Sequence, residues 1–122
     1  MNFDRIRPSV VAVRATIPAD AFTADTLGTR REGSGVVIRQ NGLVLTIGYL
    51  ITEAEEVWLT RHDGVVIPGH ALAYDQETGF GLVQALGDLG LPALPFGDSA
   101  RAKVSDEIAL IFFFKQKTAY EI

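Results

Sequence analysis

GVVIRQNGLVLT, residues 35–46, is the stretch that says most about how this chain folds. Two apolar β-rich runs, 36–38 and 43–45, flank the pair Asn41-Gly42. Asn-Gly tolerates the positive φ angles of a tight turn, and between two such runs it is the strongest short-range hairpin signal. The stretch therefore predicts two antiparallel strands joined by a tight turn.

Further short β-rich runs lie on both sides of this hairpin. A second hairpin is predicted with Asp63-Gly64 at its tip, and Pro68-Gly69 predicts a bulge or an edge in its second strand. The polar segment 18–33 has no clear period and is expected to be a mobile loop. About six strands result, with the turn spacing of an all-β sandwich or barrel. They are expected over residues 10–17, 35–39, 43–46, 57–60, 65–74 and 81–85.

A closed or nearly closed antiparallel barrel is expected over residues 9 to about 85, because strands of this kind alternate between a buried and an exposed face. Hydrophobic residues make up 48% of the 122 residues, enough to bury a core. No helix longer than about two turns is expected. The interior is expected to contain Val11, Val13, Val37, Val44, Leu59, Val66, Leu72 and Leu82.

Charge and composition exclude several classes of function. Lys and Arg number 11, Asp and Glu number 15, and the net charge of −4 is spread without a basic block, which disfavours a nucleic-acid partner. Without cysteine there is no disulfide framework, no thiolate zinc site and no Cys nucleophile. No apolar run reaches the roughly 18 residues of a membrane span, and the start lacks the pattern of an export signal. As written, the chain is expected to be cytoplasmic, with no cofactor and no metal.

Three stretches in order resemble the HtrA/Deg type of trypsin-like serine proteases. They are 33–46, 74–83 and 91–99, and residues 104–110 are similar to the first strand of that family's second barrel. The resemblance covers roughly residues 8 to 111. It implies a six-stranded antiparallel β-barrel, the N-terminal half of a chymotrypsin/trypsin-like double barrel whose active site lies between the two halves. It also makes the periplasm a second possible compartment.

The same resemblance places two positions of the catalytic triad. The family's catalytic His is the third residue after the Thr that ends the hairpin, and here that residue is Tyr49. Its catalytic Asp follows the Thr of the second motif, and here that residue is Gly79. A Tyr with a reference pKa of about 10 is a poor proton acceptor at neutral pH, and Gly has no side chain to orient a base. The nucleophilic Ser belongs to the second barrel, so every triad position is vacant or outside this chain.

Other residues that could carry chemistry are better explained by structure. His62 precedes a hairpin tip and His70 lies on a strand, so both are expected to be exposed or at an edge. Asp75 is expected to cap its turn, and Ser34 lacks the flanking residues of a nucleophile elbow and is expected to be a tight strand start. An acidic cluster after the Thr46 hairpin is expected to be a solvated face, formed by Glu53, Glu55 and Glu56.

The chain divides into four expected segments. Residues 1–8 are an N-terminal tail, 9–98 the barrel, and 99–111 a linker and the truncated start of a second barrel. The run KQKTAYEI at 115–122 resembles the translation of a common sequencing-adapter oligonucleotide, so we interpret 112–122 as an artefactual tail. The alternative is a natural terminal strand followed by a polar tail. An artefact there implies that the natural protein continues beyond Leu110.

Three hypotheses for the function follow. In the first, the chain is a truncated, catalytically degenerate HtrA/Deg-like homologue that acts at most as a binding or scaffold module for unfolded polypeptides or a protein partner. In the second, it is a fragment of a serine endopeptidase whose nucleophile lies in the missing C-terminal barrel. In the third, it is a small orphan barrel that resembles proteases in architecture only, since a fold does not imply a function.

Overall fold

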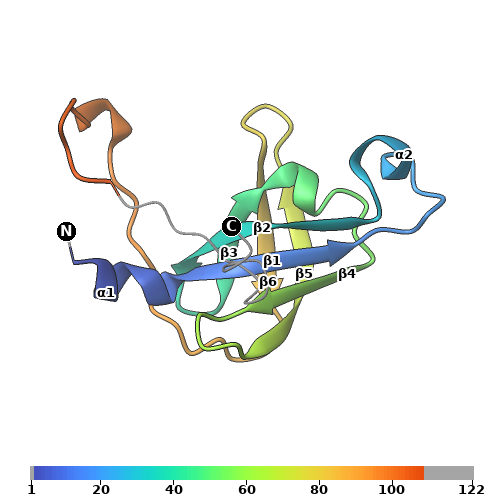
Figure 1. The fold of residues 1–122 in the computed structure, drawn as a ribbon, viewed down its shortest axis with the longest axis horizontal. Coiled ribbons are helices and arrows are strands. Elements are labelled where there is room, and N and C mark those ends of the chain that lie inside the picture. The colour runs from blue at the N-terminus through green and yellow to red at the C-terminus, as the bar shows by residue number, and fades with distance from the viewer. Residues whose placement is uncertain (1, 109–122) are drawn as a thin grey trace, which may run out of the picture.

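The computed structural model describes residues 2–108. Six antiparallel strands close into a barrel in the order β1-β2-β3-β6-β5-β4 (Figure 1). The expected fold class, an all-β six-stranded antiparallel barrel, is confirmed. The strands are β1 (Val10–Thr16), β2 (Arg30–Arg39), β3 (Leu43–Ile47), β4 (Glu56–Thr60), β5 (Val66–Tyr74) and β6 (Phe80–Ala85).

Both predicted hairpins are present, and a left-handed glycine makes each turn. Gly42 has φ +89° between β2 and β3, and Gly64 has φ +90° between β4 and β5. These φ angles favour glycine because a side chain there would crowd the backbone. The two Gly positions read from the sequence therefore fix the two turns.

The helical segments are single turns. α2 and the early start of β2 lie within the segment 18–33 that was expected to be a loop, because Arg30 pairs with Thr16 on β1. The N-terminal residues form helical turns and not a plain tail. The segments are α1 (Phe3–Ile6), η1 (Arg7–Ser9), α2 (Ala24–Leu27), η2 (Gly48–Leu50) and η3 (Ser99–Arg101).

The barrel interior agrees with most of the expected core. Five of the expected side chains are at most 1% exposed, namely Val11, Val13, Val37, Val44 and Leu59. Three expected positions are wrong: Val66 and Leu72 are about half exposed, at 48% and 54%, and Leu82 is only partly buried.

The register of β5 and β6 explains these errors. Directly opposite residues of an antiparallel pair share a face of the sheet. Leu59 lies opposite Ile67, so Ile67 faces inward and Val66 faces outward. Val44 lies opposite Val83, which puts Val83 inside and its neighbour Leu82 outside.

The expectation that Leu72 is buried is wrong for a further reason. The bulge that was one expectation at Pro68-Gly69 is absent, because both residues pair regularly with β4, whereas the edge that was the other begins there, since the pairing with β4 ends at Gly69. The register with β6 shifts instead between Ala71 and Ala73, so Leu72 occupies a bulge. A bulge interrupts the alternation of the strand, which the sequence pattern did not show at this position.

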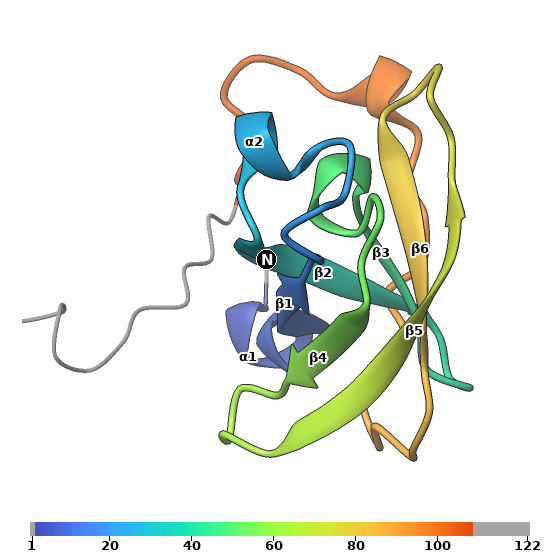
Figure 2. The same ribbon diagram turned by 90° about the vertical axis from the view of Figure 1, so that its right-hand side faces the viewer.

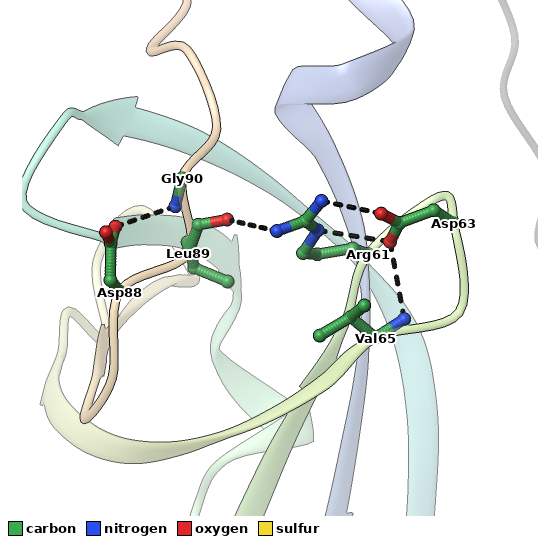
Figure 3. A network of polar contacts seen from close by, with 6 residues as sticks. All are labelled: Arg61, Asp63, Val65, Asp88, Leu89 and Gly90. Atoms are coloured by element: carbon green, nitrogen blue, oxygen red, sulfur yellow. Dashed lines mark hydrogen bonds and ion pairs between the residues drawn. The ribbon is translucent and has the colours of Figure 1, made fainter.

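The segment after β6 completes the core. Leu89 and Leu91 are buried in the same cluster as the strand residues. Arg61, beyond the end of β4, holds the segment: its guanidinium donates to the Leu89 carbonyl at 3.1 Å and pairs with Asp63 at 2.6 Å (Figure 3). The hydrogen bond from Arg61 lowers the pKa of the Asp63 carboxyl. The chain from 86 to 91 is thus part of the barrel although it forms no strand.

The remaining part of the chain is exposed where it is described. Over 99–108 only the single turn η3 forms, and Val104 and Ile108 are 98% and 87% exposed. The expected strand at 104–110 is therefore wrong over its described part, 104–108. Residues 109 and 110 of that expected strand lie outside the described residues. So do the end of the segment 99–111 and the whole of 112–122, which we interpret as an artefactual tail.

Candidate active site

A sharp corner follows β3 and contains Tyr49. Gly48, the first residue of η2, is packed so closely that a Cβ atom would lie 2.0 Å from the ring of Tyr74. Its N–H donates to the Gly79 carbonyl at 2.6 Å. Only glycine fits this approach, since real Cβ atoms do not come so near another heavy atom. The packing of Gly48 thus brings together the two chain segments that carry Tyr49 and Gly79.

The residues after Tyr49 anchor the corner. Leu50 is fully buried and Ile51 is 4% exposed, whereas Tyr49 itself is 44% exposed. The Thr52 hydroxyl donates to the Gly48 carbonyl at 3.0 Å and closes the turn. The corner therefore holds Tyr49 at the surface above a buried aliphatic pair.

The turn that carries Gly79 is built around Asp75. The Asp75 carboxylate accepts from the Glu77 N–H at 3.1 Å and from the Thr78 hydroxyl at 2.9 Å. The Gly79 N–H donates to the Asp75 carbonyl at 2.8 Å. As expected, Asp75 caps its turn, so this carboxylate is engaged in local structure.

Gly79 adopts a backbone conformation that favours glycine. Its φ is +81°, and an added Cβ would meet no atom within 4 Å. The space for a side chain exists, but a carboxylate-bearing residue there would carry the cost of the left-handed conformation, about 1–2 kcal/mol. The turn is thus shaped for a residue without a side chain.

A buried arginine, which the sequence reading did not single out, supports the corner from behind. Arg31 on β2 is only 3% exposed. Its guanidinium donates to the carbonyls of Tyr49 at 2.7 Å and Thr52 at 3.0 Å, and to the Thr23 hydroxyl at 2.9 Å. A planar guanidinium with five N–H donors can bind several oxygen acceptors arranged around it in this way. Arg31 joins the corner to the loop between β1 and β2.

Glu53 makes the second connection between this loop and the corner. Its carboxylate accepts from the N–H groups of Phe22 at 2.8 Å and Thr23 at 2.7 Å. Hydrogen bonds from Thr23 and Phe22 lower the pKa of Glu53, and the nearby Arg31 charge contributes in the same direction. Glu53 is exposed, as expected, but it has a structural role that a purely solvated face lacks.

The other candidate residues belong to other elements of the barrel. His62 is exposed in the β4–β5 turn, and His70 is exposed within β5. Ser34 is exposed in the middle of β2, not at its start, and its carbonyl accepts from the Thr46 hydroxyl at 2.8 Å. Within residues 2–108, no three His, Asp or Glu side chains are grouped as a metal site would require. No helix in that range has the length and apolar character to cross a membrane.

Comparison with known proteins defines the class. The trypsin-like peptidase domain matches residues 33–119, more than half of the chain. The chain belongs to this family. Within it, the chain is of the HtrA/Deg type, because its relatives and its structural neighbours are of that type.

Two relatives illustrate the match. A probable periplasmic serine endoprotease DegP-like of Halomonas elongata is 29% identical over 82 residues, which cover 67% of this chain and 17% of the relative. The serine endoprotease DegS of Salmonella typhimurium is 26% identical over 109 residues, covering 82% of this chain and 31% of the relative. This chain therefore spans less than a third of either relative.

Solved structures show the same fold. The HtrA-type protease AlgW with tripeptide superimposes with a TM-score of 0.69 at 21% identity, covering 84% of this chain and 31% of AlgW. The share of AlgW that is matched agrees with one barrel of a larger protein. The chain is thus an HtrA-like serine protease fragment that contains a single barrel.

Proposed function

We propose that this chain is the first barrel of a catalytically degenerate HtrA-type protein that binds polypeptide without cleaving it. One observation carries the proposal. The corner and the turn that the family uses for its His and Asp are in direct contact through the Gly48–Gly79 hydrogen bond, yet they present Tyr49 and Gly79. The scaffold of the site is retained while its proton-transfer groups are replaced.

The chemistry of the replacements supports loss of catalysis. Acyl transfer by a serine nucleophile needs a base that accepts the hydroxyl proton and returns it to the leaving amine, and a partner that fixes the base. A phenol with a reference pKa of about 10 does not accept that proton at neutral pH. The other candidate bases support the same view: His62 and His70 are exposed on the β4–β5 turn and on β5, and the Asp75 carboxylate caps its own turn.

The alternative function is that of a fragment from an active serine endopeptidase whose nucleophile lies in the missing barrel. The printed names of the relatives favour it, since they are endoproteases. One of those names, that of the probable periplasmic DegP-like endoprotease, also favours the periplasm over the cytoplasm expected from the start of the chain. Under either function, a substrate polypeptide would meet the face that carries the corner.

A chimera separates the two functions. This barrel is joined to the second barrel of an HtrA-type protease, which supplies Ser and oxyanion hole, and a fluorophosphonate probe reports an activated Ser. The proposal expects no labelling and no casein cleavage with Tyr49 and Gly79 in place, and labelling above that background after Tyr49→His with Gly79→Asp. The parent protease is the positive control. Labelling of the unsubstituted chimera at the parent's rate would refute the proposal and favour an active enzyme with a relocated base.

A further inference from the structure

Strand β5 is longer than its neighbour β4 on one side of the barrel. The register between β4 and β5 ends where Val57 lies opposite Gly69, whereas the register between β5 and β6 runs on to Tyr74 opposite Gly81. Figure 2 shows β5 continuing along β6 beyond β4. Residues 70–74 thus have a paired strand on one side only. Among the described residues, the backbone hydrogen bonds outside the strand pairs include none from 70–74.

The chain before β4 turns away from this edge. Glu53 adopts a left-handed conformation with φ +62°, and the Glu55 N–H then donates to the Thr16 carbonyl on the β1 side at 2.8 Å. β4 begins only at Glu56. A hollow of about 290 Å³ remains next to β5, lined by residues 51–53 and 71–74. It lies beside the part of β5 that β4 leaves unpaired.

Strand alternation shows which backbone groups face the open side. The Pro68 carbonyl accepts from the Leu86 N–H at 2.9 Å, so this carbonyl points toward the β6 side. The N–H and C=O of successive strand residues point to opposite sides. The backbone N–H and C=O of Gly69 therefore point toward β4, and those of His70 point toward β6. The backbone groups of Ala71 point toward the open side. Ala71 offers a donor and an acceptor where an added strand would lie.

We propose that residues 70–74 bind an extended, uncharged polypeptide segment as an added strand next to β5. The inference rests on the proposed function, since it names where the polypeptide binds. Main-chain hydrogen bonds would hold the segment irrespective of its sequence, which is the mode of recognition known as β-strand addition. The hollow beside residues 51–53 would receive its inward side chains.

The side chains of this edge favour an apolar occupant. HALAY, residues 70–74, contains no Asp, Glu, Lys or Arg. Leu72 and Tyr74 are 54% and 46% exposed. Exposed edge strands are usually protected by charges, above all by Lys, because unpaired edges attract other strands. This edge lacks that protection, so apolar and β-branched peptide segments are its natural partners.

A flexible peptide fits the edge better than a second copy of the chain. The bulge between Ala71 and Ala73 bends the strand, and bulges hinder flat pairing between two rigid edges. A flexible segment follows the bend. In addition, a five-residue edge is far smaller than the roughly 20–30 residues a side of a stable protein interface. The structure therefore favours a weak, reversible complex with an unfolded segment.

A backbone-resolved titration tests the site. An eight-residue peptide of alternating valine and threonine, with a lysine at each end for solubility, is added to the ¹⁵N-labelled 122-residue chain. The proposal expects amide shifts concentrated at residues 70–74 and 51–53. The same peptide N-methylated at its central amides cannot donate and should bind at least about tenfold more weakly. Equal affinity of the two peptides would overturn the inference.

A pair of protein variants tests the location. Leu72→Lys adds a charge to the edge, and Leu86→Lys adds the same charge at a side chain that is 65% exposed just after β6. The proposal expects at least about tenfold weaker peptide binding for Leu72→Lys and less than a twofold change for Leu86→Lys. Equal effects of the two variants, or concentration-dependent dimers of the free chain that Leu72→Lys abolishes, would overturn it.

Reduced, carboxymethylated α-lactalbumin separates failure of this inference from failure of the proposed function. If that unfolded protein binds uncleaved but shifts no residue of the edge, the inference fails and the proposed function stands. If neither probe binds, both fail. If the edge binds the short peptide and the chimera with the second barrel cleaves at the parent's rate, the edge site stands and the proposed loss of catalysis fails.

Discussion

At the scale of single residues, glycine controls the geometry of the corner. Gly48 allows the corner to approach Tyr74 and to donate to the Gly79 carbonyl, and Gly79 provides the left-handed backbone of the opposite turn. Both features depend on the absence of a side chain. The contact between the segments that carry Tyr49 and Gly79 is therefore sensitive to a single methyl group.

Gly48→Ala should destabilise the barrel. The new Cβ would lie 2.0 Å from the Tyr74 ring and 3.0 Å from the Gly79 carbonyl oxygen, which forces one of them to move. Overpacking of this kind costs about 1–3 kcal/mol, or a melting temperature lower by roughly 5–15 °C. Calorimetry measures the shift. Gly97→Ala, where no atom lies within 4 Å, is the control, and Tyr74→Ala should relieve part of the cost. A melting temperature unchanged by Gly48→Ala would contradict the packing described.

Glu53 should make the β1–β2 loop sensitive to acid. The hydrogen bonds that Glu53 accepts lower its pKa from the ordinary 4.5. The contribution of these hydrogen bonds to folded-state stability is therefore fully present above pH 4.5. The contribution is lost as the pH falls below about 4.5 through the folded pKa. The amide signals of Phe22 and Thr23 should shift in that window together with the Glu53 carboxyl signal in an NMR titration. Glu53→Gln should remove this transition, and its persistence in that variant would assign it to another group.

At the scale of elements, one buried cation joins three parts of the fold. Arg31 connects β2, the corner η2 and the loop that contains α2, while Glu53 joins the same loop to the corner. The loop between β1 and β2 is thus held to the corner by polar contacts, although it has little regular structure. A change in the loop would be transmitted to Tyr49 through the carbonyl that Arg31 holds.

Arg31→Met should cost more stability than any exposed arginine. The substitution keeps an aliphatic stem but leaves the carbonyls of Tyr49 and Thr52 without their donor. Buried acceptors left unpaired in this way cost about 1–3 kcal/mol each. Chemical denaturation should show a loss of roughly 2–4 kcal/mol. Arg30→Met, on an exposed neighbour, should change stability by less than about 0.5 kcal/mol. Similar losses for the two variants would contradict the role of Arg31.

At the scale of the whole molecule, the barrel ends later than its last strand. Leu89 and Leu91 are buried after β6, and the Leu94 N–H donates to the Val37 carbonyl at 2.9 Å. Residues 99–108 are exposed throughout. The expected barrel limit at residue 98 agrees with this packing and stays a prediction until it is tested by truncation.

Two truncations test the limit. The chain 1–98 should keep the melting temperature of the full chain within about 5 °C. The described residues that this truncation removes, 99–108, are exposed, and residues 112–122 are expected to add nothing to the fold. The chain 1–85 should melt far lower or fail to fold, since losing two buried leucines costs on the order of 2–5 kcal/mol each. A large loss already in 1–98 would show that 99–122 contains a genuine structural element.

Features that depend on local chemistry could be predicted from the amino-acid sequence. Asn41-Gly42 and Asp63-Gly64 specify their turns because left-handed φ angles are a property of those residues and not of distant contacts. The alternation of β1 and β3 located their buried side chains. The resemblance to HtrA/Deg-type proteases singled out Tyr49 and Gly79, and their assignment to vacant triad positions remains a prediction.

Features that depend on pairing between distant segments became clear only from the folded barrel. Which face of β5 is buried follows from the partner of Ile67, and a one-residue shift would reverse it. The edge beside Leu72 is unpaired because β4 begins only at Glu56, and the bulge at Leu72 is a shift of register between β5 and β6. Most acceptors of Arg31 lie 8 to 21 positions away in the chain and meet its buried guanidinium only when the barrel closes. Local patterns set the turns and strands, whereas burial and register depend on contacts that form only in the folded chain.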